Sequence, residues 1–196
     1  MKKFLICLLL SVCFASCNSE KKINVSEVPI KTNVLGVEMG QKVDIDCTYN
    51  LWIEPMFLTG GLVFTPSFEQ ITPNIVLYMC QPKGDDHYYY GGIKWSYLTI
   101  GTIKNKIVFD ITLTGSYDTI EEAKTQYENV LERLSQIYGK GNIVQNGTMW
   151  TDMVNFILLN YNENKAQNGS IRGFCELRYR NIELEKEVEK EINNEF

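Results

Sequence analysis

The clearest pattern of apolar and polar positions lies in residues 107–139. Residues 107–113 alternate apolar with more polar positions, the period of a strand with one buried face. The apolar positions of this strand are Ile107, Phe109, Ile111 and Leu113. Residues 118–138 instead carry apolar side chains at helical spacing. Thr119 and Glu122 are spaced for a capping box, and Gly139 stands where a left-handed C-cap residue belongs. We therefore predict a strand, a turn and one long helix over about 118–138.

Short β-type runs precede this unit. Residues 62–64, 75–80 and 93–103 are rich in strand-forming residues, so residues 75–114 are predicted to form an antiparallel meander. We also expect an edge strand over 23–29 and a glycine-bracketed turn over 35–40. Residues 52–58 are apolar but are interrupted by Pro55, which favours a short helix or a loop there.

Further strands follow the long helix. The pair Asn146-Gly147 lies between apolar residues and is a strong signal for a two-residue hairpin. Residues 153–161 form an apolar strand, and 171–180 alternate again, with Cys175 on the apolar side. Residues 181–196 are rich in Glu and Lys and carry an apolar residue at every fourth position, which predicts a lightly docked C-terminal helix. The predicted fold is therefore α+β, an antiparallel sheet in β-β-α-β-β order with the long helix packed on it.

The N-terminal residues predict export. Lys2 and Lys3 precede a short apolar run over 4–10, as in a signal peptide, and this run is too short to span a bilayer. The residues Phe14-Ala15-Ser16-Cys17 then resemble the lipobox of bacterial lipoproteins. That resemblance implies cleavage before Cys17, whose thiol carries diacylglycerol. An ordinary secretory signal and an uncleaved anchor are the alternatives.

A lipid anchor defines the expected organisation of the chain. Acyl chains contribute about 0.8 kcal/mol for each buried CH₂ group, so no transmembrane helix is required. We expect a signal peptide over 1–16, a tether over 17–22 and a single α+β domain over 23–196. The expected location is the bacterial cell envelope, at the outer membrane, with the membrane contacted through Cys17.

Charge argues against nucleic acid as a partner. The whole chain has a net charge of −5, and removal of residues 1–16 also removes two lysines. Binding to a phosphate backbone needs a basic face. Arg172, Arg178 and Arg180 are the one basic cluster, and we interpret them as a solvated face of the sheet.

Residues for catalysis or metal binding are few. His87 is the only histidine, so neither a Ser/His/Asp triad nor a histidine metal site can be assembled. We therefore expect no enzyme, no cofactor and no metal. Two carboxylate pairs remain arithmetically possible, Asp44 with Asp46 and Asp110 with Glu176. Beyond Cys17, the thiols of Cys47, Cys80 and Cys175 allow at most one internal disulfide, which is left open, and Cys175 is interpreted as a small buried hydrophobe.

An aromatic stretch over 88–97 is the candidate binding site for a ligand or partner. Its candidate residues are Tyr88, Tyr90, Trp95 and Tyr97. Alternation places Tyr88 and Tyr90 on one face and Tyr89 on the other, whereas Trp95 and Tyr97 share a face. Exposed rings on a sheet stack on sugars or anchor a protein partner. The structural alternative is that these rings belong to the core or cover an edge strand.

Three short motifs carry a resemblance to a known group. They are Gly92-Ile93-Lys94-Trp95, the residues 134–141 (Leu-Ser-Gln-Ile-Tyr-Gly-Lys-Gly) and Leu177-Arg178-Tyr179-Arg180-Asn181. Together they look like a group of small uncharacterised lipoproteins of gut anaerobes, known mostly as domains of unknown function. The folds of that group are similar to β-lactamase-inhibitor-protein-like modules, in which a helix packs on an antiparallel sheet. The resemblance implies a fold whose relatives bind enzymes or belong to outer-membrane assembly machines, and it assigns no functional residue.

Two functions are expected from the sequence. The first is a lipid-anchored, non-catalytic interaction module of the cell envelope, which binds an envelope protein. The alternative is a lipoprotein that binds a small ligand or a glycan through residues 88–97.

Overall fold

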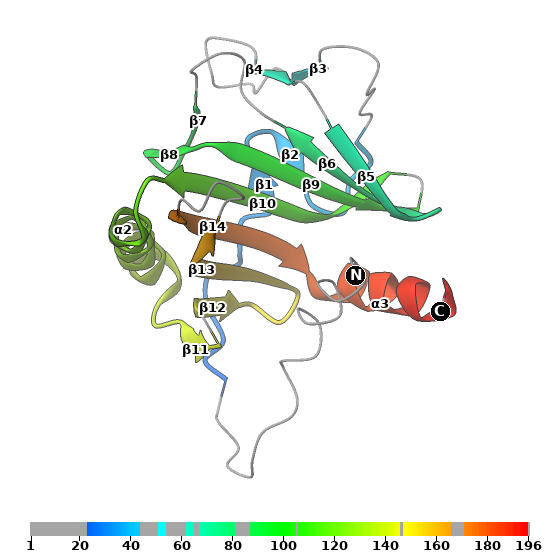
Figure 1. The fold of residues 1–196 in the computed structure, drawn as a ribbon. Coiled ribbons are helices and arrows are strands. Elements are labelled where there is room, and N and C mark those ends of the chain that lie inside the picture. Colours follow the sequence, from blue (N-terminus) through cyan, green and yellow to red (C-terminus); the bar gives the residue numbers. More distant parts are fainter. Residues whose placement is uncertain are drawn as a thin grey trace.

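The computed structural model confirms the α+β class, with an antiparallel sheet, a long helix packed on it and a C-terminal helix (Figure 1). The structure describes residues 23–43, 51–53, 62–64, 67–80, 87–104, 106–145, 147–165 and 171–195. The predicted lipidation site Cys17 and the tether therefore lie outside the described residues. Among the described residues, no helix has the length and apolarity needed to cross a membrane.

The main sheet has eight antiparallel strands in the order β11-β12-β13-β14-β10-β9-β6-β5. In chain order these are β5 (Ser67–Thr72), β6 (Ile75–Cys80), β9 (Tyr97–Ile103), β10 (Ile107–Tyr117), β11 (Asn142–Val144), β12 (Gly147–Thr151), β13 (Asn155–Lys165) and β14 (Ile171–Asn181). The last strand returns to pair with β10, so two meanders separated by the long helix join at the centre of one sheet. The predicted meander over 75–114 is confirmed, with a hairpin inserted between β6 and β9.

Three small hairpins accompany the sheet. They are β1 (Asn33–Val34) with β2 (Val37–Glu38), β3 (Leu51–Ile53) with β4 (Leu62–Phe64), and β7 (Tyr88–Tyr90) with β8 (Ile93–Trp95). The first turns through Leu35 and Gly36, whose φ angles of 54° and 82° suit a two-residue hairpin. The strand at β3 corrects the expected helix or loop for residues 52 and 53, and residues 54–58 lie outside the described part.

The long helix α2 (Ile120–Tyr138) begins and ends as its sequence predicts. The Thr119 side chain accepts a hydrogen bond from the Glu122 backbone N–H, and the Glu122 carboxylate accepts one from the Thr119 N–H, which completes the capping box. Gly139 follows with a φ of 77° and donates its N–H to the Ser135 carbonyl. Each cap satisfies backbone groups that have no partner inside the helix.

One face of the sheet forms the main core with α2. The helix buries Ala123, Val130, Leu134 and Tyr138 against side chains of β13, β14 and β10. Gly173 in β14 allows this close approach, because a Cβ atom there would lie 2.2 Å from the Thr119 carbonyl oxygen. The alternation predicted for β14 is confirmed, since Cys175, Leu177 and Tyr179 are all buried. The thiol of Cys175 is free, so no Cys80–Cys175 disulfide forms, and Cys47 lies outside the described residues.

The C-terminal helix α3 (Ile182–Glu195) docks on the opposite face, at one end of the sheet (Figure 1). Val188 is buried against Ile75, Ile103 and Phe109, with Leu184 and Ile192 beside it. Phe109 reaches this face because a β-bulge between Val108 and Asp110 inserts it as an extra residue. The bulge corrects the prediction that Phe109 shares a face with Ile111.

Three local predictions are wrong in detail. Residues 23–29 form no strand, although the Ser26 N–H donates to the Thr151 carbonyl at the end of β12. The expected strand over 93–103 is divided by a bend at Ser96, whose N–H donates to the Thr114 carbonyl. Gly147 already pairs with Val144 as the first residue of β12, so it is not part of the two-residue turn predicted for it, and Asn146 lies outside the described residues.

Candidate binding face of the sheet

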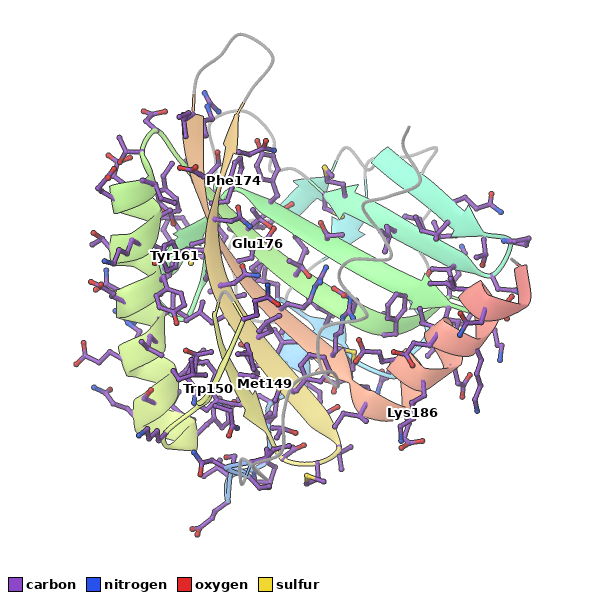
Figure 2. All side chains as sticks on the ribbon, turned by 60° about the horizontal axis from the view of Figure 1, so that its bottom comes forward. Met149, Trp150, Tyr161, Phe174, Glu176 and Lys186 are labelled. Atoms are coloured by element: carbon purple, nitrogen blue, oxygen red, sulfur yellow. The ribbon has the colours of Figure 1, made fainter. Side chains whose placement is uncertain are left out.

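The two faces of the sheet are covered to different extents. The odd-numbered side chains in the middle of β13 and β14, such as Leu159 and Leu177, are buried in the main core on the side of α2. Their even-numbered neighbours point to the other face, where α3 covers only the end near β5, β6 and β9. Figure 2 shows Trp150 and Tyr161 on the side of α2, with Met149, Phe174 and Glu176 directed away from it. The face opposite α2 is therefore the candidate surface for a partner.

Strand register fixes the neighbours on this face. Arg178 lies opposite Leu158 on β13 and Thr112 on β10. Leu158 in turn lies opposite Met149 on β12. Glu176 lies opposite Thr114, which is opposite Tyr97 on β9. We call this surface the open face and define it by its partly or fully exposed residues, Met79, Tyr97, Met149, Leu158, Phe174, Glu176 and Arg178.

A buried carboxylate organises the centre of the open face. The side chain of Asp110 is only 4% exposed, and its Oδ2 atom lies 2.7 Å from Arg180 Nε and 3.2 Å from Arg178 Nε. Thr112 donates its hydroxyl to Asp110 Oδ1 at 2.7 Å and accepts a hydrogen bond from Arg178 Nε at 3.0 Å. Arg180 also pairs with Glu185 at the start of α3. The network therefore joins the two central strands to the C-terminal helix.

The charges in this network hold each other ionised. Burial alone raises the pKa of the Asp110 carboxyl, but the guanidinium groups of Arg178 and Arg180, with hydrogen bonds from Thr112 and Arg180, outweigh burial and lower it. Burial alone lowers the pKa of Arg180, and the carboxylates of Asp110 and Glu185 raise it above its usual value. The pairs are therefore charged at neutral pH, and one partner cannot be removed without leaving a charge poorly compensated.

This network corrects the interpretation of Arg178 and Arg180 as part of a solvated face, whereas Arg172 is exposed as predicted. Arg180 is 18% exposed at its side chain and Arg178 is 27% exposed, so both are largely enclosed. The signal in the sequence was Asp110, the one charged residue of the strand Ile107–Tyr117. Two arginines at alternate positions of another strand are its natural counterions, since same-face residues of a strand are two apart.

The structure divides the four predicted aromatic residues between two environments. Tyr88 and Trp95 are completely buried in the main core, so neither ring is available to a ligand. Tyr90 is half-buried, packs edge-on against Tyr179 with ring centroids 6.2 Å apart, and accepts a hydrogen bond from the Tyr179 hydroxyl. Only Tyr97 lies on the open face. The alternation within β7 is confirmed, because Tyr89 is 52% exposed while Tyr88 is buried.

Trp95 and Tyr97 do not share a face, which corrects the prediction. The bend at Ser96 separates β8 from β9, so Trp95 turns into the core and donates its indole N–H to the Tyr90 carbonyl. Tyr97 then pairs with Thr114 in the main sheet. Alternation does not hold across a break between two strands.

The described residues offer little for chemistry. No group of three or more His, Cys, Asp or Glu side chains in this part of the chain is placed to hold a metal ion. Asp110 lies opposite Arg180 and Glu176 lies opposite Thr114, so the strand register keeps these two carboxylates apart, and the pair that the sequence left possible does not form. Burial raises the pKa of the Cys175 thiol to about 12. A thiol in that state is a poor nucleophile. Asp44 and Asp46 lie outside the described residues.

Two hollows lie beside α2. One, of about 480 Å³, is lined by Ser116, Tyr117, Asp118, Glu122, Thr125 and Gln126. The other, of about 450 Å³, lies between the β7–β8 hairpin and α2 and includes Lys94, Gln126 and Arg133. Gln126 lines both, and its buried Nε2 atom has no hydrogen-bond partner among the described residues.

Comparison with known proteins finds no matching family model, curated protein or solved structure. The resemblance to small lipoproteins therefore stays a prediction. The structure defines the class as an α+β protein with a helix on one face of an antiparallel sheet. Function has to be argued from the residues on its other face.

Proposed function

We propose that the protein is a lipid-anchored, non-catalytic interaction module of the cell envelope, and that an envelope protein docks on the open face. The observation that carries the proposal is the partly exposed set of apolar side chains around Arg178, on a face that α3 covers only at one end. Exposed apolar groups of this kind, with an arginine among them, are typical of protein interfaces.

The dimensions of the open face favour a protein partner. Its residues lie on β12, β13, β14, β9 and β6, and with β10 between β14 and β9 these are six neighbouring strands of the sheet. Strands in a sheet are about 4.8 Å apart, so the open face is roughly 24 Å wide. A surface of this width suits a macromolecule better than a small ligand, which proteins usually enclose in a cleft.

The chemistry of the open face sets a preference for its partner. Met79, Met149, Leu158 and Phe174 supply apolar area, and methionine adapts to irregular surfaces. Arg178 is held by Asp110 and Thr112 through its Nε atom, with its side chain 27% exposed. A fixed guanidinium binds a carboxylate with two parallel hydrogen bonds. The expected partner surface is therefore apolar with one acidic side chain at its centre.

The lipid anchor is proposed from the lipobox-like residues that end in Cys17. A protein held at a membrane meets envelope partners at a raised effective concentration, as any tethered module does. The outer membrane is the proposed location.

The test is cross-linking in living cells followed by purification of the protein and its partner. We compare wild type with Met149→Ala, Phe174→Ala and Cys17→Ala, and we use Ile137→Ala as the matched control, since Ile137 is exposed on α2. One partner is expected with wild type and Ile137→Ala, and its recovery is expected to fall in both open-face variants. Equal recovery in all folded variants would exclude the open face. If the Cys17→Ala variant were found in the membrane fraction to the same extent as wild type, the proposed lipid anchor would be refuted.

Binding of a small polar ligand is the second candidate function. The observation in its favour is the hollow beside α2, where Lys94 and Arg133 lie near the buried amide of Gln126. The core positions of Tyr88 and Trp95 count against a stacking site for a glycan at residues 88–97. A glycan and metabolite screen with Arg133→Ala as the control variant separates this function from protein docking.

A further inference from the structure

The exposed apolar side chains of this protein gather at one edge of the main sheet. Of the ten large hydrophobic residues that are exposed among the described residues, six lie in three short segments around the β11–β12 edge. We call these six the apolar edge, which consists of Ile23, Val25, Val28, Ile143, Met153 and Val154. They are between 45% and 75% exposed.

Hydrogen bonds hold the three segments together. The Asn24 N–H donates to Asn142 Oδ1 at 2.7 Å, and Asn142 Nδ2 donates to the Asn24 carbonyl at 2.8 Å. The Ser26 N–H donates to the Thr151 carbonyl at 2.7 Å. Figure 1 shows the N-terminal segment passing beside β11 and β12. The apolar edge is therefore part of the folded domain.

Asp152 ties the third segment to the first. Its Oδ2 atom accepts the Ile30 N–H at 2.8 Å, and its Oδ1 atom accepts the N–H groups of Val154 and Asn155. Burial raises the pKa of this carboxyl, but the backbone hydrogen bonds from Asn155, Ile30 and Val154 outweigh burial and lower it. The carboxylate is thus occupied by the backbone, next to the exposed Met153.

Few charges interrupt the apolar edge. Residues 23–30 contain one charged side chain, Glu27, and residues 141–145 contain none. Exposed apolar residues at this density are unusual for a surface that faces only water, and they mark a site for a membrane or a protein. A low charge density keeps the cost of leaving water small.

We propose that the apolar edge lies against the lipid bilayer, an inference that rests on the proposed lipid anchor at Cys17. The length of the tether is the argument for this occupant. Residues 17–22 span at most about 20 Å when fully extended, so Ile23 stays within that distance of the anchored acyl chains. The part of the domain nearest the membrane is therefore the apolar edge, and apolar side chains at that depth enter the boundary between headgroups and acyl chains.

The contact would also set the orientation of the domain. The β11–β12 edge and β5 lie at opposite edges of the main sheet. With the β11–β12 edge on the membrane, the plane of the sheet is roughly perpendicular to the bilayer. The open face is then directed parallel to the membrane surface. A partner on the same membrane surface then reaches the open face without a longer tether.

The experiment uses the lipidated full chain in vesicles of phosphatidylethanolamine and phosphatidylglycerol that carry a photoreactive diazirine lipid. Lipid adducts are located by mass spectrometry. The expected result is adducts in peptides 23–28, 142–145 and 152–155, and their absence at the equally exposed Met79 and Tyr89. The double variant Ile143→Asp and Met153→Asp should reduce adducts at the edge to the level at Met79, whereas Tyr89→Asp should leave them unchanged.

Flotation of the vesicles separates the two proposals. If wild type does not float with the vesicles, the lipid anchor is refuted, and this inference with it. If wild type floats but adducts are absent from the edge or equal at Met79, only the inference is overturned. The inference would also be overturned if the edge carried no lipid adducts and an amine cross-linker joined Lys31 to a second copy of the protein. That result would assign the apolar edge to self-association.

Discussion

The change Asp110→Asn tests whether the buried charge network supports the fold. The amide keeps the shape of the side chain and its hydrogen bond with Thr112 but removes the charge shared by two guanidinium groups. Removing one partner of a buried ion pair costs about 3–5 kcal/mol. We expect the lower value, about 3 kcal/mol, because Arg180 keeps Glu185 and Arg178 is partly exposed.

Urea unfolding followed by the fluorescence of the buried Trp95 and Trp150 measures the loss of stability. In thermal unfolding, the same loss of about 3 kcal/mol should lower the melting temperature of Asp110→Asn by about 6–12 °C for a domain of this size. The matched control is Glu187→Gln, the same change at an exposed pair in which Lys104 Nζ and Glu187 Oε2 are 3.3 Å apart. That control should cost less than about 1 kcal/mol. A cost for Asp110→Asn no larger than that of the control would refute the reasoning.

The same variant has a defined pH signature. The pKa of Asp110 is lower in the folded protein than its usual value of 3.8, so its ion pairs stabilise the fold above that value. That stability is lost as the pH falls through the folded pKa. The difference in unfolding free energy between wild type and Asp110→Asn should be constant from about pH 7 to pH 5 and should narrow below about pH 4. A difference that persisted unchanged to about pH 2 would contradict the assigned pKa shift.

Three further predictions concern the packing. Gly173→Ala should destabilise the protein by about 3 kcal/mol in urea, because the new Cβ meets the Thr119 carbonyl, and a loss below about 1 kcal/mol would show that α2 shifts easily. Val188→Ala should cost about 2 kcal/mol and speed amide exchange in α3 but not in α2, since Val188 packs on Phe109. Equal exchange in both helices would mean that α3 is not an independent unit. Cys175 should resist iodoacetamide at pH 8 until the protein unfolds, since its pKa is raised to about 12, and labelling of the folded protein would refute its burial.

Local sequence signals predicted the helices and the strands around them well. The capping box at Thr119 and the glycine after Tyr138 fix the ends of α2, because these signals act through neighbouring backbone groups. The alternation in residues 171–180 also predicted the buried face of β14. Successive side chains of a strand point to opposite faces of the sheet, and α2 covers the face with the apolar ones.

The open face and its network were missed because they depend on pairing between distant strands. Arg180 meets Asp110 only because β14 returns beside β10, and the spacing along the chain does not report that pairing. The bulge at Phe109 and the bend at Ser96 each changed the face of nearby side chains, and a pattern of period two cannot show such breaks. For residues 88–97 the sequence left two interpretations open, a binding surface and a place in the core, and the second holds for Tyr88 and Trp95.

The most direct test of the proposed partner surface is photo-cross-linking from single positions in living cells. A photoreactive amino acid replaces Met149, Leu158 or Phe174 on the open face, and Ile137 on α2 as the control. We expect one and the same partner to be captured from the three open-face positions and not from position 137. Capture from position 137 alone, or no capture from any open-face position in a folded, membrane-bound protein, would contradict docking on the open face.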